Sequence, residues 1–92
     1  MTYRGAQNLI KRGDEAGLRA ALNGSLSSNL ANPNGWTLLM LAAVEGHASI
    51  GQLLLEKGAK TVATNNKGQT ALDIAMQKGH TAFAELLQTH TS

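Results

Sequence analysis

The sequence predicts an all-α solenoid of three helix–turn–helix units joined by β-turn or hairpin-like loops. One observation is an internal repeat: residues 32–59 align with residues 65–92, an offset of 33, and nine of the 28 aligned pairs are identical. Another is a set of apolar triples with i, i+3, i+4 spacing, which form one stripe of an amphipathic helix. These triples are Leu18/Ala21/Leu22, Ile50/Leu53/Leu54 and Phe83/Leu86/Leu87.

Length and composition fit one ordered domain over residues 1–92, with repeats at approximately 1–31, 32–64 and 65–92. Hydrophobic residues make up 42% of the chain but aromatic residues only 3%, so the core must consist mainly of Leu, Ile, Val and Ala. Cysteine is absent, which excludes a disulfide scaffold, a thiolate metal site and a cysteine nucleophile.

The charge pattern gives little indication of a nucleic-acid or membrane partner. The net charge of +2 comes from eight Lys+Arg and six Asp+Glu, which are scattered along the chain. No apolar run is long enough to span a membrane, and residues 1–12 lack the layout of a signal peptide. We therefore expect a soluble cytoplasmic protein.

Each full unit is expected to begin with a tight turn. Asn32-Pro33-Asn34-Gly35 opens the second unit and Asn65-Asn66-Lys67-Gly68 opens the third; Asn and Gly tolerate positive φ, and Pro presets the bend. Thr37 and Thr70 follow where helix N-caps belong. Thr70 and Asp73 have the spacing of a capping box.

Two short helices complete each full unit. Gly46 and Gly79 are expected to end the first helix in the left-handed conformation, and Gly58 ends the second helix of the middle unit. The first unit fits more loosely and begins at a helix, with Gly13 placed 33 residues before Gly46. Since one unit cannot bury its apolar stripes alone, the units should stack. The expected helices of the full units run over approximately 37–45, 48–57, 70–78 and 81–89.

These motifs resemble the ankyrin-repeat family, whose period is 33 and whose signature is T-P-L-H-x-A. Residues 37–43 read Thr-Leu-Leu-Met-Leu-Ala-Ala and residues 70–75 read Thr-Ala-Leu-Asp-Ile-Ala. Gly46-His47 and Gly79-His80 follow them, and residues 53–59 are similar to the family's L-L-L-E-x-G-A ending. The resemblance covers residues 6–90 and implies an ankyrin-repeat solenoid that binds other proteins in a concave groove.

The chain departs from the signature at two positions in each full unit. Leu38 and Ala71 replace the proline, and Met40 and Asp73 replace the histidine. The family's usual Thr–His hydrogen bond at the helix start therefore lacks its histidine. The stretch around Asp73 resembles a last repeat, and residues 8–18 resemble a first, capping repeat.

No constellation for catalysis or metal binding is found. The sequence contains no G-x-S-x-G elbow and no Gly-rich phosphate loop, and its carboxylates form no obvious acid–base pair. His47 and His80 lie one repeat apart, about 10 Å by helix diameter, which is too far to share one ion. We expect each to start a second helix and to bond to nearby backbone, and His90 to be exposed. Neither enzyme activity nor a cofactor or metal is expected.

The resemblance implies partner contacts around the turn glycine, at the end of the first helix and before the closing glycine. Met40 is added because it takes the place of the signature histidine beside the groove. The candidates are Lys11 and Arg12 in the first unit, Pro33, Asn34, Trp36, Met40, Val44, Glu45 and Lys57 in the second, and Asn66, Lys67, Gln69, Gln77 and Lys78 in the third.

Two interpretations remain open for the aromatic and basic residues of this set. Trp36 is the only tryptophan and is either an interface anchor or a ring that covers the neighbouring turn or the 25–34 linker. Tyr3 is expected to pack against the start of the first unit, and Phe83 to lie in the core. The lysine and arginine side chains form either a solvated surface or a surface for an acidic partner. These residues are Lys11, Arg12, Lys57, Lys60, Lys67 and Lys78.

The leading functional interpretation is a non-catalytic module that binds another protein through the concave groove. One alternative is a structural or assembly role, as a subunit that self-associates through an end cap or Trp36, or as an isolated or engineered scaffold. A basic nucleic-acid-binding surface is disfavoured, since the sequence has no clustered Arg stripe and few aromatics for stacking.

Overall fold

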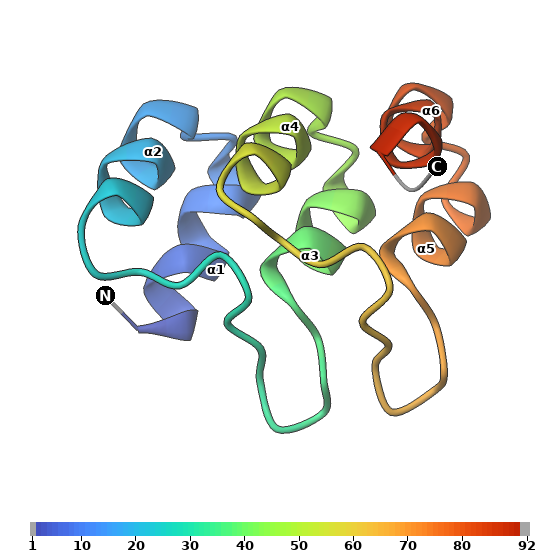
Figure 1. Cartoon of the computed structure of the whole chain (residues 1–92), viewed down its shortest axis with the longest axis horizontal. Helices are drawn as coiled ribbons and strands as arrows, with labels where there is room; N and C mark the ends of the chain where they lie inside the picture. Colours follow the sequence, from blue (N-terminus) through green and yellow to red (C-terminus); the bar gives the residue numbers. More distant parts are fainter. Residues whose placement is uncertain (1, 91–92) are drawn as a thin grey trace.

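The computed structural model describes residues 2–90, which form two rows of helices (Figure 1). The inner row contains α1 (Tyr3–Arg12), α3 (Leu38–Glu45) and α5 (Ala71–Gln77), and the outer row contains α2 (Glu15–Asn23), α4 (Ala48–Glu56) and α6 (Thr81–His90). Helices pack on their neighbours in the same row and on their partner in the other row. The predicted all-α stack of three units is therefore confirmed.

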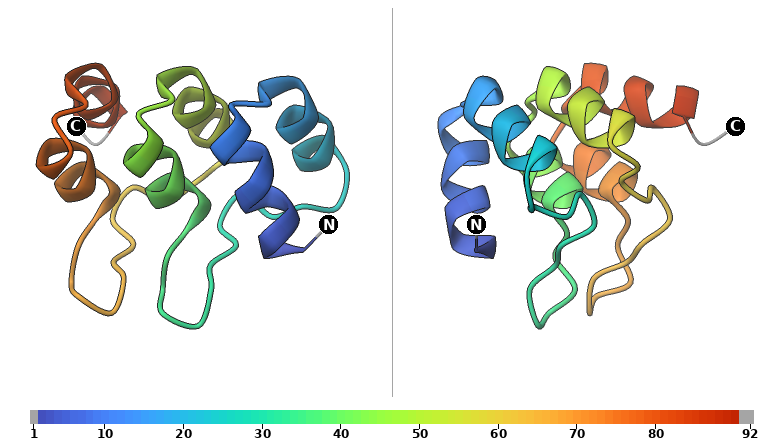
Figure 2. Two further views of the ribbon diagram at one scale, coloured as in Figure 1. Left: turned by 180° about the vertical axis from the view of Figure 1, so that it is seen from behind. Right: turned by 60° about the vertical axis from the view of Figure 1, so that its left-hand side comes forward.

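Two long loops leave the helical rows and project to one side, as Figure 1 and the views in Figure 2 agree. Their ends, which we call the tips, are residues 32–36 and 65–69. Within residues 2–90 the extended pairing consists of one isolated antiparallel bridge, Ala31–Thr37. The loops are thus hairpin-like, as expected, without forming a sheet.

The sequence signals for helix ends operate as expected. The hydroxyls of Thr37 and Thr70 accept hydrogen bonds from the N–H groups of Met40 and Asp73, each at 3.2 Å. The carboxylate of Asp73 in turn accepts from the N–H of Thr70 at 3.1 Å, which completes the capping box. At α5, the residue that replaces the signature histidine therefore contributes to the helix cap.

The core runs between the two rows through all three units. Its largest members are aliphatic, together with Phe83, which is 1% exposed as predicted. Tyr3 and Trp36 are partly buried and pack against this core. Met40 is 1% exposed and belongs to the core as well, so its side chain is not available to a partner. The expectation for Met40 is wrong because the packing of α3 against α1, α4 and α5 buries this position.

Histidines and glycines join consecutive repeats at the ends of the inner helices. Gly13 and Gly46 end α1 and α3 with φ of 71° and 73°. A Cβ on Gly46 would lie 2.6 Å from Nδ1 of His80, and one on Gly13 would lie 3.3 Å from Cε1 of His47. The His80 ring also hydrogen-bonds through Nε2 to the carbonyl oxygen of Val44 at 3.1 Å. Each ring therefore packs onto the preceding repeat and needs glycine beneath it.

Candidate partner-binding face

An asparagine at the start of each tip organises the turn. The Oδ1 atom of Asn32 accepts hydrogen bonds from the N–H groups of Asn34 and Trp36, at 3.0 and 2.9 Å. The Oδ1 atom of Asn65 accepts equivalent bonds from Lys67 and Gln69, at 2.9 and 3.1 Å. Such side-chain bonds to the following backbone fix a turn without a sheet. The two tips therefore have one common, internally bonded conformation.

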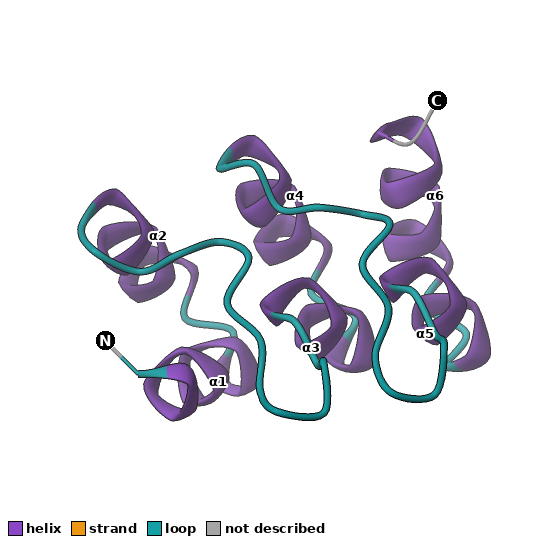
Figure 3. Cartoon of the chain, turned by 60° about the horizontal axis from the view of Figure 1, so that its bottom comes forward, coloured by secondary structure: helices purple, strands orange, loops and turns teal. Residues whose placement is uncertain are grey.

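The two tips are also bonded to each other. The N–H of Asn66 donates to the carbonyl oxygen of Asn34 at 2.8 Å. Gly35 approaches the second tip so closely that a Cβ there would lie 3.0 Å from Cα of Asn65, and its φ is 81°. Only glycine combines that φ with so close an approach. The tips consequently form one surface, which Figure 3 shows in front of the inner helices.

We call this surface, together with the exposed sides and C-terminal ends of α1, α3 and α5, the inner face. The structure brings most of the predicted contact residues onto it. Pro33, Asn34, Asn66 and Lys67 are exposed at the tips. Exposed or partly exposed residues at the ends of the inner helices are Lys11 and Arg12 of α1, Val44 and Glu45 of α3, and Gln77 and Lys78 at the end of α5.

Trp36 and Gln69 occupy equivalent positions at the junction of tip and helix. Trp36 is partly buried and packs against the core. The Nε2 of Gln69 donates to Oε1 of Gln77 at 3.2 Å. These two side chains therefore connect the second tip to the C-terminal end of α5. The inner face is thereby continuous from the tips to the helix ends in the last repeat.

Lys57 does not lie with the other candidates. Its Nζ donates to Oδ1 of Asn23 at 2.6 Å, and its carbonyl oxygen accepts from the hydroxyl of Ser28 at 2.9 Å. These partners belong to the end of α2 and the loop that follows it. Lys57 therefore joins consecutive repeats at the C-terminal ends of the outer helices, away from the tips.

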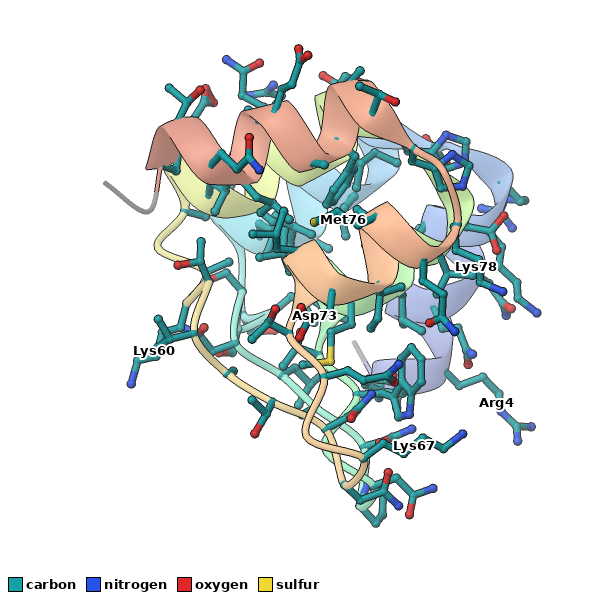
Figure 4. The ribbon with its side chains drawn as sticks, turned by 90° about the vertical axis from the view of Figure 1, so that its right-hand side faces the viewer. Arg4, Lys60, Lys67, Asp73, Met76 and Lys78 are labelled. Carbon is teal, nitrogen blue, oxygen red and sulfur yellow. The ribbon has the colours of Figure 1, made fainter. Side chains whose placement is uncertain are left out.

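Arg4 is a residue of this side that the sequence analysis did not select. It is exposed on α1 and points to the same side of the stack as Lys67 and Lys78 (Figure 4). The repeat offset could have identified it, because Arg4 lies 33 residues before Thr37, at the start of an inner helix. Arg4 therefore lies at the position of the helix caps Thr37 and Thr70, while α1 itself is capped by Thr2, whose hydroxyl accepts from the N–H of Gly5 at 3.2 Å.

Residues 2–90 contain no group of three His, Cys, Asp or Glu side chains that could hold a metal ion. His80 is bonded to backbone, but that carbonyl lies 36 residues earlier and not nearby in the chain. Among the titratable groups, burial raises the pKa of the Tyr3 phenol above its ordinary value of 10.0. The buried Tyr3 hydroxyl has no hydrogen-bond partner within the described chain.

Comparison with known proteins identifies the family. A family model described as "Ankyrin repeats (3 copies)" matches residues 6–92. The chain therefore belongs to the ankyrin-repeat family, as its motifs indicated.

Similar curated proteins are much longer than this chain. The NAD-capped RNA hydrolase NUDT12 of Homo sapiens is 49% identical over 78 residues, which cover 84% of this chain and 17% of that enzyme. The human M-phase phosphoprotein 8 is 38% identical over 74 residues, covering 78% of this chain and 9% of the relative. The chain thus spans about a sixth or less of these relatives, and the activities of the whole proteins are not transferred to it.

A solved structure shares the fold along the full chain. It is described as the Bd0816 predatory endopeptidase from Bdellovibrio bacteriovorus in complex with immunity protein Bd3460. One of its chains matches with a TM-score of 0.90 at 27% identity, over 100% of this chain and 48% of that chain. Among residues 2–90, no helix combines the length and apolar character needed to cross a membrane.

Proposed function

We propose that the chain is a non-catalytic module that binds a segment of another protein on its inner face. The observation that carries this proposal is the bonded pair of tips. Because Asn32 and Asn65 fix both turns and Asn66 joins them to Asn34, a partner would meet a preorganised surface, and little conformational entropy would be lost on binding. Family membership supports the same class, since solenoids bind through such extended surfaces.

Trp36 provides the apolar anchor of this surface. A tryptophan that is partly accessible and held by the core loses little further freedom when a partner covers it. Asn34, Asn66 and Lys67 are exposed at the tips and would form the polar rim of the contact. The related solved structure described above is itself a complex of two proteins.

Site-specific photocrosslinking tests the proposal. A photoreactive amino acid is placed at Asn34 or Gln77 on the inner face, and at Gln52 or Glu85 on the outer helices, all four being exposed. After irradiation in cell extract, the two inner positions should capture the same protein, and the outer positions should not. Trp36→Ala should reduce that capture at an unchanged helical circular dichroism signal. Capture only from the outer positions, or none from the inner ones, would contradict the proposal.

A second candidate function, assembly through the end of the last repeat, rests on Met76. Met76 is 61% exposed, whereas the residues at the same place in the other repeats, Ile10 and Ala43, are 0% exposed. Figure 4 shows Met76 on the end of the stack, between α5 and α6. Light scattering over a concentration series tests assembly through this end of the stack. Met76→Lys is compared with Gln52→Lys, a control that adds the same charge on an outer helix. A monomer throughout excludes assembly, whereas a dimer that Met76→Lys alone dissociates supports it.

A further inference from the structure

We propose that the inner face selects an acidic segment of its partner, with an apolar side chain seated beside Trp36. This inference rests on the proposed function and adds the chemistry of the bound segment. It follows from how the charges are distributed over the two sides of the stack, since the net charge of +2 alone indicates very little.

The cations of the inner face are free to meet a partner. Arg4, Lys67 and Lys78 are exposed and come from three different places, namely α1, the second tip and the end of α5. Figure 4 shows them on one side of the molecule, while Lys60 points to the opposite side. Within residues 2–90, the ion pairs are Arg12–Asp14 and Arg19–Glu15, each at 3.4 Å. The three cations therefore have no carboxylate of their own.

The carboxylates are engaged or placed elsewhere. Asp14 and Glu15 are in those two ion pairs, and Asp73 is bonded to the N–H of Thr70. Glu56 and Glu85 belong to the outer helices α4 and α6. Glu45 is the exception, at the end of α3. The inner face thus has an excess of positive charge, and complementary charges on a partner would raise its association rate and fix its orientation.

The shape and spacing of these groups favour an extended acidic peptide over a nucleic acid. Strong binding of nucleic acid needs several cations that follow one phosphate backbone, with aromatic rings for stacking. The inner face instead offers separated cations and a single, partly accessible tryptophan. A peptide can place its carboxylates at the cations and direct an apolar side chain to Trp36.

Fluorescence of the single tryptophan measures this binding directly. The probe is a short acetylated peptide of glutamates with one central leucine, and its counterparts carry glutamine or lysine in place of every glutamate. We expect a saturable change in Trp36 emission with the glutamate peptide and not with the counterparts. The affinity should fall several-fold between about 50 and 200 mM salt, because exposed charges are screened over about a Debye length.

Two triple variants with the same loss of charge locate the binding. The test variant combines Arg4→Gln, Lys67→Gln and Lys78→Gln, and should bind the glutamate peptide about tenfold more weakly. The control combines Arg19→Gln, Lys57→Gln and Lys60→Gln, none of which lies on the inner face. It should change affinity less than about twofold, since these charges are distant from the peptide. Circular dichroism confirms that both variants are folded.

Several results would overturn the inference. They are an equal loss in both variants, equal binding of the glutamine peptide, no saturable change below a Kd of about 1 mM, or tighter binding of an oligonucleotide than of the glutamate peptide. Failure of the proposed function is distinguished by the crosslinking experiment described above. If a protein is captured at Asn34 and Gln77 but binds the two triple variants equally, the proposed function stands and the preference for an acidic segment is refuted.

Discussion

Replacing Gly46 with alanine should destabilise the stack much more than the same replacement at Gly79. Both glycines have a left-handed conformation, with φ of 73° and 75°, so the conformational cost of an added Cβ is about 1–2 kcal/mol at either site. Their surroundings differ. A Cβ at Gly46 would lie 2.6 Å from Nδ1 of His80, whereas one at Gly79 would have nothing within 4 Å.

The contact distance sets the extra cost at Gly46. A 2.6 Å approach has to be relieved by moving the His80 ring, and overpacking of this kind costs about 1–3 kcal/mol. Moving the ring also weakens its hydrogen bond to the carbonyl of Val44, worth about 1 kcal/mol. We therefore expect the free energy of unfolding to fall by about 3–6 kcal/mol for Gly46→Ala and about 1–2 kcal/mol for Gly79→Ala. Gly13→Ala, with its 3.3 Å approach to His47, should fall between them.

Urea unfolding followed by far-UV circular dichroism measures these differences, and the slope m shows whether the stack still unfolds in one step. A double variant with His80→Ala removes the ring that the new Cβ strikes. The cost of Gly46→Ala should then approach that of Gly79→Ala, which gives a coupling energy of about 2–4 kcal/mol. If Gly46→Ala and Gly79→Ala agree within about 0.5 kcal/mol, or if His80→Ala leaves the difference unchanged, the reasoning is refuted.

Three further stability predictions follow from single contacts. Gly51→Ala places a Cβ 2.6 Å from the Phe83 ring and should cost about 1–3 kcal/mol in urea unfolding; an unchanged midpoint would count against the packing of α4 on α6. Thr70→Ala removes the capping box and should cost about 1 kcal/mol, whereas Thr81→Ala, at an exposed position in the first turn of α6, should cost less. Tyr3→Phe removes a buried hydroxyl without a partner in the described chain and should stabilise by about 1 kcal/mol. Since burial raises the Tyr3 pKa above 10.0, the unfolded chain releases this proton first, and the tyrosine's contribution to stability declines as the pH rises above 10. Melting temperatures measured across that range should fall more steeply for the wild type than for Tyr3→Phe.

The fold could be predicted from the sequence because its determinants are local and occur twice. Thr70, Asp73 and Gly46 act within a few residues of their own helix ends, and such signals survive in any context. The apolar triples identify the buried stripes, which the stack then covers. Each end of the four helices in the full units accordingly lies at the expected residue or one residue away from it.

The candidate site could be predicted less completely because exposure depends on neighbours distant in sequence. Met40 follows the position rule for a groove residue, yet the packing of α3 against its neighbouring helices buries it. Lys57 follows a similar rule, yet its ammonium bonds to Asn23, 34 residues earlier. Arg4 was not predicted because the first unit aligns only loosely with the other two. For Met40 and Lys57, packing between elements distant in sequence, which the repeat motif does not specify, decided what remained accessible.

Comparison of the two full repeats separates the residues that build the stack from those that are free to recognise a partner. The identical pairs include Asn32/Asn65, Thr37/Thr70 and His47/His80, which organise tips, cap helices and pack onto the preceding repeat. The inner-face positions differ instead: tryptophan becomes glutamine at 36 and 69, and glutamate becomes lysine at 45 and 78. Since a change of charge at an exposed helix end alters stability by only about 0.5 kcal/mol, these positions can follow the chemistry of a partner while the stack beneath them stays the same.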